Sequence, residues 1–201
     1  MLMSKRITVL FIWDVEEHLR SHLNSRLGHV PDIDLIFPSA TAQEALVKLA
    51  PKADIIVGWR PTKELLFAAK KLQLSINPGA GVQHLTDLFR EVTRSKKILL
   101  ANCHGNSYSV AQHAVALLLA LMNKVVLHHN WMVAGEWRKR DEDAKSLPLR
   151  SRKMGLLGYG AVNQKVHRFL SGFHPNFSIL RRDWERQFAQ LPTPTKKYSY
   201  P

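Results

Sequence analysis

The stretch GLLGYGAVNQKV (residues 155–166) has the spacing of a glycine turn between a strand and a helix. Gly158 would allow the tight turn after the strand, and Gly160 would let the backbone approach a dinucleotide pyrophosphate at the helix N-terminus. Asn163 stands where the third glycine belongs, so we expect it to push the helix outward or to demand a compensating change. An ordinary strand-to-helix turn is the alternative, but the strand before and the helix after it favour nucleotide binding.

The first hundred residues alternate between β-rich runs and helical patterns. Asp14 and Glu17 are expected to form a capping pair for the first helix. Repeated strand–helix units with short connections favour a parallel sheet that helices cover on both faces. We therefore predict a flavodoxin-like α/β domain over residues 1–105. Its five strands are expected within residues 6–13, 32–38, 53–59, 73–79 and 97–103.

From Ser109 the pattern changes to one long helix that reaches Gly135 and is apolar nearly all the way round at its centre. Such a helix must be buried between elements, domains or subunits. Only two strands, at residues 153–158 and 177–182, are expected after it, because the remainder has no apolar period. Residues 106–201 are therefore predicted to hold the long helix and a partial Rossmann domain.

The composition narrows the class of protein. A formal charge of +13 would attract nucleic acid, but the basic residues are spread along the chain without a recognisable nucleic-acid module, so nucleic acid is not expected as a partner. The single cysteine, Cys103, excludes an internal disulfide framework and suits the cytoplasm. The longest apolar stretch, residues 114–122, is far shorter than the ~20 residues that cross a bilayer, so no membrane span is expected.

The end of the second nucleotide-domain strand bears on the choice of cofactor. In dinucleotide-binding folds an acidic residue there usually binds the ribose hydroxyls of NAD. Here the strand ends in Arg181, Arg182 and Asp183, and Arg181 lies 181 − 158 = 23 positions after Gly158, about where the acid belongs. An arginine could pair with a 2′-phosphate through its planar guanidinium, which favours NADP. A solvated basic strand end is the alternative.

An ordered set of motifs resembles the D-isomer-specific 2-hydroxyacid dehydrogenase family, which includes phosphoglycerate and glyoxylate/hydroxypyruvate reductases. The motifs are ADIIVGW, NPGAGVQHL, NSYSVAQHAVALLLAL, WMVAGEW and GLLGYGAVNQKV. The resemblance implies reversible reduction of a 2-oxo acid to a D-2-hydroxy acid with NAD or NADP. It also implies a substrate-binding first domain, an active site between the domains and a homodimer through the long helix.

The resemblance carries over to particular residues of the first domain. PGAGV looks like the family's substrate loop, in which backbone N–H groups around Ala80, Gly81 and Val82 face the substrate carboxylate. A plain strand-to-helix turn is the alternative, and Gln83 replaces the family's usual aspartate.

Two further sets of residues follow from the resemblance. The GWRPT turn is similar to the family's other substrate-side turn, with Arg60 and Thr62 as secondary contacts. The implied cofactor site comprises Gly158, Tyr159, Gly160, Ala161, Val162, Arg181 and Arg182.

The family's catalytic arginine, glutamate and histidine come from later parts of the nucleotide domain, beyond this chain. No catalytic residue is therefore expected, and the chain alone is expected to be truncated and inactive; the alternative is a non-catalytic binding or subunit-pairing remnant. In SVAQH, Gln112 replaces the glutamate that the family has at this position. The next residue, His113, is expected to be a packed, hydrogen-bonded histidine. His128 and His129 are adjacent and cannot share a helix face, so no metal site is expected.

Overall fold

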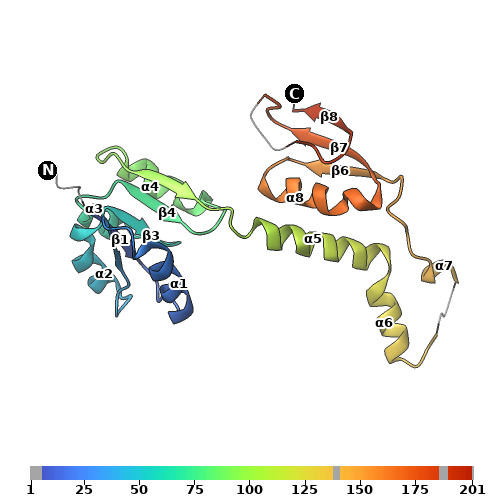
Figure 1. Cartoon of the computed structure of the whole chain (residues 1–201), viewed down its shortest axis with the longest axis horizontal. Helices are drawn as coiled ribbons and strands as arrows, with labels where there is room; N and C mark the ends of the chain where they lie inside the picture. Colours follow the sequence, from blue (N-terminus) through green and yellow to red (C-terminus); the bar gives the residue numbers. More distant parts are fainter. Residues whose placement is uncertain (1–5, 138–140, 186–189, 201) are drawn as a thin grey trace. The chain divides into compact units, whose positions relative to one another are not determined.

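The computed structural model describes residues 6–137, 141–185 and 190–200. The chain forms two compact units, Met1–His104 and Gly105–Pro201, and each contains a parallel β-sheet (Figure 1).

The sheet of the first unit has the strand order β2-β1-β3-β4-β5, and all four neighbouring pairs are parallel. This is the order of flavodoxin-like doubly wound sheets, so the predicted fold class is confirmed. Each strand lies inside one of the five predicted apolar runs. The strands are β1 (Ile7–Phe11), β2 (Ile33–Ile36), β3 (Ile55–Val57), β4 (Leu74–Asn77) and β5 (Leu99–Asn102).

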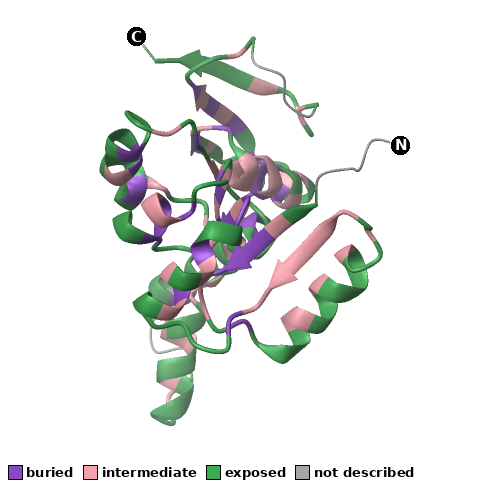
Figure 2. Ribbon diagram, turned by 90° about the vertical axis from the view of Figure 1, so that its left-hand side faces the viewer, coloured by how far each residue is buried: buried purple, intermediate pink, exposed green. Residues whose placement is uncertain are grey.

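Helices cover both faces of this sheet because successive side chains of a strand point to opposite faces. Val9 and Phe11 of β1 belong to a cluster with helix α1 (Glu17–Leu27), whereas Leu10 belongs to the cluster on the other face. Figure 2 shows the buried residues concentrated on the inner strands and the exposed ones on the outer helix surfaces. The other face is covered by α2 (Gln43–Leu49), α3 (Lys63–Ala68) and α4 (Thr86–Val92), with the short 3-10 turns η1 (Ala50–Lys52) and η2 (Gln83–Leu85).

The predicted capping pair at the start of α1 is wrong. The N-cap residue is Glu16, and its side chain makes no capping hydrogen bond. Asp14 instead accepts a hydrogen bond from the Arg20 guanidinium at 3.0 Å. The Asp14 carboxylate thus binds Arg20, one turn into the helix, instead of capping the N-terminus of α1.

The second unit combines a three-stranded parallel sheet with two packed helices. In Figure 1, α8 (Ala161–Leu170) lies against the sheet and α5 (Ser107–Met122) runs alongside α8. Their common core includes Leu170, Phe177 and Ile179. The sheet has the order β6-β7-β8, with β6 (Lys153–Leu157), β7 (Asn176–Arg181) and β8 (Thr195–Ser199), and the 3-10 turn η3 (Ser171–Phe173) precedes β7.

Strand β8 corrects the expectation of only two strands after the long helix. Its sequence, TKKYS, has no apolar alternation, yet it pairs with β7 from Phe177↔Thr195 to Arg181↔Ser199. Backbone pairing along β7 does not require apolar side chains, so hydropathy gave no signal for this strand.

The single long helix predicted from Ser109 to Gly135 is also wrong. Helices α5 and α6 (Val125–Val133) meet at a bend of 60°. Lys124 adopts a left-handed conformation with φ 53°, and the Asn123 side chain donates to the Leu119 carbonyl at 2.9 Å. Asparagine competes for backbone carbonyls in this way and so favours helix ends over helix interiors. The short helix α7 (Asp141–Ala144) follows in the chain.

These two helices are far less buried than their apolar sequence predicts. Helix α5 buries only Ser107 and Ala111, and α6 contains no buried residue. Leu121 and Val133 are each 75% exposed. Within the described residues, no single helix has the length and apolarity of a membrane span; α5 and α6 reach that threshold only when taken together across their bend.

Candidate functional site

The dinucleotide turn, defined here as residues 158–162, joins β6 to α8. Gly158 has φ +79°, a left-handed conformation that side chains other than that of glycine rarely adopt. Its N–H donates to the Leu180 carbonyl at 2.8 Å, which ties the turn to β7. Gly160 is the N-cap of α8, and a Cβ atom added at either glycine would meet no atom within 4 Å. The backbone of the turn is therefore open on the side where a ligand would approach.

Asn163 supplies the compensating interaction that its position demands. Its side-chain amide donates to the Leu157 carbonyl at 3.0 Å and to the Gly158 carbonyl at 2.9 Å. The residue that replaces the third glycine thus binds the first part of the turn. Helix α8 begins regularly, because the Gln164 N–H donates to the Gly160 carbonyl at 3.1 Å.

Tyr159 lies between the two glycines, but its side chain is buried under the turn and only 5% exposed. Its hydroxyl lies 2.9 Å from Nδ1 of His167, which is itself fully buried. Burial raises the pKa of Tyr159, although Arg168 and Arg181 oppose that effect, and burial lowers the pKa of His167. The ring of Tyr159 is therefore not accessible to a cofactor.

The two arginines at the end of β7 have different surroundings. Arg181 is 8% exposed, and its guanidinium lies 5.6 Å from the centre of the Trp184 ring. Arg182 is exposed. Asp183 accepts a hydrogen bond from the Glu185 N–H at 2.8 Å, which forms a local turn. Of the two guanidiniums, that of Arg182 is the accessible one.

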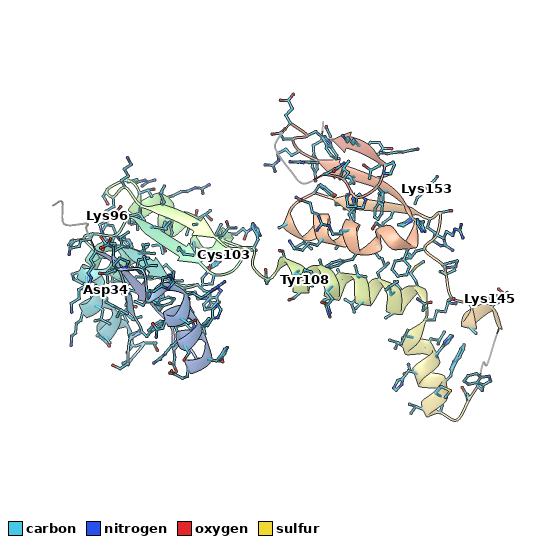
Figure 3. The ribbon with its side chains drawn as sticks, viewed as in Figure 1. Asp34, Lys96, Cys103, Tyr108, Lys145 and Lys153 are labelled. Atoms are coloured by element: carbon cyan, nitrogen blue, oxygen red, sulfur yellow. The ribbon has the colours of Figure 1, made fainter. Side chains whose placement is uncertain are left out.

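The substrate loop, defined here as residues 79–82, is held from the ends of two neighbouring strands. Asn77 donates its side-chain amide to the Gly79 and Gly81 carbonyls at 2.9 and 2.8 Å. Asn102 donates to the Ala80 carbonyl at 2.6 Å. Cys103, labelled just after β5 in Figure 3, donates its N–H to the Gly79 carbonyl at 3.2 Å. This anchoring does not require the aspartate that Gln83 replaces.

Sequence reasoning missed both anchoring asparagines. The available signal was their position near the end of a predicted strand region. Each is the last residue of its strand in the structure, and the two are register partners in the sheet. Parallel strands bring their carboxyl ends to one edge, where doubly wound sheets bind ligands.

The GWRPT turn lies at the same sheet edge as the substrate loop. The Trp59 carbonyl is 2.8 Å from Nε2 of His84, and its indole approaches Gly79, so the two predicted substrate-side turns are brought together. Arg60 is exposed. Thr62 instead caps α3 by accepting a hydrogen bond from the Leu65 N–H at 3.2 Å.

The histidines of α5 and α6 do not gather. His113 is exposed, so the expectation of a packed histidine is wrong. His128 lies 3.0 Å from the Ala144 carbonyl through Nε2 and stacks on Trp131. Across residues 6–137, 141–185 and 190–200, no group of three metal-ligating side chains has the arrangement of an ion site.

Comparison with known proteins assigns the second unit to a described domain family. The model of the D-isomer specific 2-hydroxyacid dehydrogenase, NAD binding domain, matches residues 115–194. The formate dehydrogenase of Chaetomium thermophilum is 34% identical over 113 residues, which make up 56% of this chain and 30% of that protein.

Solved structures extend the likeness in fold to both units. A D-isomer specific 2-hydroxyacid dehydrogenase family protein from Aeromonas salmonicida is 22% identical with a TM-score of 0.73, covering 98% of this chain and 59% of that one. The NAD-dependent formate dehydrogenase from Staphylococcus aureus, in complex with NAD, is 23% identical with a TM-score of 0.59, covering 96% of this chain and 60% of that one. The chain thus spans less than two thirds of each of these proteins.

Proposed function

The chain belongs to the D-isomer-specific 2-hydroxyacid dehydrogenase family, and from this we propose that it serves NAD(P)-dependent interconversion of 2-oxo acids and D-2-hydroxy acids. The observation that carries the proposal is the strand–turn–helix unit formed by β6, the dinucleotide turn and α8. In it β6 pairs in parallel with β7, and Gly158 has φ +79°. This unit lies within the segment that matches the NAD-binding domain model.

The residues present fit a dinucleotide. The backbone of Gly158 and Gly160 is open to a ligand, and the N-terminus of α8 offers unpaired N–H groups and a positive dipole to a pyrophosphate. A bound nicotinamide cofactor would supply the hydride that the reaction transfers. The part of this chain in the reaction is to seat and orient the pyrophosphate through residues 158–162.

We assign the preference for NADP to Arg182. Its guanidinium is exposed next to the end of β7 and can pair with a 2′-phosphate, whereas Arg181 is packed on Trp184. Substrate carboxylate binding is assigned to the backbone at Ala80, Gly81 and Val82. Arg60, an exposed cation at the GWRPT turn, is assigned as a secondary contact to the substrate.

Within this proposal the 201-residue chain does not turn over 2-oxo acids by itself. The resemblance assigns the catalytic arginine, glutamate and histidine to later strands and loops of the nucleotide domain. Loss of acid–base and electrostatic groups costs roughly 10² or more each in rate. The single cysteine favours the cytoplasm as the location.

A second candidate function, subunit pairing without catalysis, is favoured by the exposed apolar surface of α5 and α6. Leu117, Leu121, Val126 and Val133 are all exposed, and such a surface favours association with a second copy. Pairing and nucleotide binding use different parts of the unit and are compatible.

The test is an assay of the purified chain with NADPH or NADH and glyoxylate, hydroxypyruvate or pyruvate, following the absorbance of the reduced nicotinamide. We expect saturable nucleotide binding without turnover. Turnover that survives further purification and disappears in Gly81→Val would show that the catalytic groups lie within these residues. Absence of nucleotide binding would leave subunit pairing as the better account.

A further inference from the structure

A chain of three polar side chains runs beneath the dinucleotide turn. Nδ1 of His167 lies 2.9 Å from the Tyr159 hydroxyl, and Nε2 lies 2.8 Å from Oγ1 of Thr193. Tyr159 sits between the two glycines of the turn, His167 belongs to α8, and Thr193 precedes β8. The chain of hydrogen bonds therefore joins three separate segments of the second unit.

Aromatic rings enclose this chain. The His167 and Phe177 ring centres are 4.1 Å apart, and the Tyr159 ring stacks on Trp184 at 6.5 Å with an interplanar angle of 26°. A buried polar group that loses its partner bears the full cost of desolvation. The direction of the Tyr159 side chain is therefore fixed by hydrogen bonding as well as by packing.

The neutral form of His167 suits this arrangement. A neutral imidazole accepts a hydrogen bond at one nitrogen and donates one at the other, which matches two hydroxyl partners. Burial lowers the pKa of His167, so the neutral form prevails at neutral pH. Two cations, Arg168 and Arg181, act on the Tyr159 hydroxyl, and Lys197 lies over the Trp184 ring.

We propose that His167 is a positioning residue for dinucleotide binding, because it holds Tyr159 and with it the backbone between Gly158 and Gly160 in the conformation that accepts a pyrophosphate. This inference rests on the proposed function of residues 158–162. His167 does not touch the ligand; it acts through Tyr159 and the backbone of the turn.

Nucleotide affinity then depends on pH. Protonation would make both His167 nitrogens donors and would place a charge in a desolvated site. Because the competent, folded form has the lower pKa, it binds fewer protons than a form in which His167 is released to water. The stabilisation that neutral His167 gives to the competent form is complete above about pH 6.5, the ordinary histidine value, and is lost as the pH falls from there through the lowered pKa of the buried side chain.

Substitutions at His167 separate the two hydrogen bonds. In His167→Asn the amide replaces Nδ1 and can still bind Tyr159, whereas in His167→Gln it replaces Nε2 and reaches only Thr193. At pH 7.5 we expect NADPH and NADH to bind His167→Asn with nearly wild-type affinity. His167→Gln, His167→Phe and Tyr159→Phe should bind about fivefold to tenfold more weakly, the effect of one net hydrogen bond. Leu170→Val, a control in the same core, should leave affinity unchanged.

A second measurement works without any nucleotide. In ¹H–¹⁵N spectra of the full chain, the amide resonances of Gly158 and Gly160 should shift with the same midpoint pH as the His167 imidazole, and this shift should vanish in His167→Phe. If nucleotide fails to bind but the glycines follow His167, the proposed function is wrong and the coupling stands. If the glycines do not follow His167, or if His167→Gln binds nucleotide as well as His167→Asn across the pH range, the inference is overturned.

Discussion

Asparagine side chains hold both candidate turns in place. Asn77 donates to two backbone carbonyls of the substrate loop, and Asn102 donates to a third. Asn163 donates to the carbonyl of Gly158 in the dinucleotide turn and to that of Leu157, the last residue of β6. The carbonyls of the two turns lie outside regular secondary structure and would otherwise be left to water. The glycines permit the turn conformations, and the asparagines select them.

The first prediction concerns Asn163. Restoring the glycine of the dinucleotide pattern, Asn163→Gly, should lower the free energy of unfolding by roughly 1–3 kcal/mol, because it removes two hydrogen bonds and adds the entropy cost of a helical glycine. Urea unfolding measures this change. Asn163→Ala removes the same bonds without that entropy cost and should be less destabilising. A more stable Asn163→Gly variant would show that the side chain strains the turn.

The second prediction separates the neighbouring arginines. Arg182→Ala should weaken NADPH binding about tenfold and leave NADH binding nearly unchanged, because only the 2′-phosphate needs the exposed guanidinium. Arg181→Ala should reduce stability instead, since Arg181 packs on Trp184. Fluorescence titrations at low salt with both nucleotides test this. Equal NADPH affinity in the wild type and Arg182→Ala would contradict the assignment.

How far single residues could be predicted depended on the type of signal. Gly158 and Gly160 follow from spacing, because a tight turn after a strand has few sequence solutions. His167 was overlooked, although it lies three residues before Leu170 on the buried face of α8. One of its partners, Thr193, lies 26 residues away in the segment before β8, and no local pattern encodes that contact.

At the level of elements, Lys96 links the end of α3 to the segment after α4. Its ammonium donates to the carbonyls of Leu66, Phe67 and Ala69 at 2.7, 3.3 and 2.9 Å, and Figure 3 labels it in the first unit. The last carbonyls of a helix lack intrahelical partners, and a cation there also interacts favourably with the helix dipole. Burial, and then the charge of Lys70, lowers the pKa of Lys96, which offsets part of this gain.

The third prediction follows from this cap. Lys96→Met keeps the aliphatic stem but leaves three carbonyls without the ammonium, and should lower the free energy of unfolding by about 1–2 kcal/mol. Lys97→Met, at the exposed neighbouring position, should change it by less than about 0.5 kcal/mol. Urea unfolding of the two variants side by side is the measurement. Equal effects at both positions would mean that the cap contributes nothing.

The predicted elements were right where the pattern of apolar residues determines the structure. They were wrong where backbone hydrogen bonds to another segment, or a turn of the backbone, determine it. The apolar runs of β1, β2, β3 and β5 pack into the clusters that include the helices. Strand β8 has no such run and depends on pairing with β7. The bend at Lys124 was missed because the apolar pattern continues through Asn123, while the backbone turns there and the Met122 carbonyl binds the Leu147 N–H at 2.8 Å.

For the whole molecule, the fourth prediction is self-association through α5 and α6. The chain should sediment at micromolar concentration with a mass above its 22.9 kDa monomer value, because the exposed leucines and valines gain from leaving water. Leu121→Lys should shift the equilibrium toward monomer. Leu157→Lys, at a leucine of β6 that is 79% exposed, is the matched control and should not. A monodisperse monomer in the wild type would contradict this interpretation.

The central claim is that residues 158–162 seat a dinucleotide, and a calorimetric titration of the chain with NADH and NADPH tests it most directly. We predict saturable binding with one site per chain, at least tenfold weaker in Gly158→Val, because a side chain at φ +79° strains the turn by roughly 1–2 kcal/mol or more. Gly155→Ala, where an added Cβ meets no atom within 4 Å, should bind like the wild type. Absence of saturable binding, or equal affinity in Gly158→Val that is folded by circular dichroism, would contradict the account.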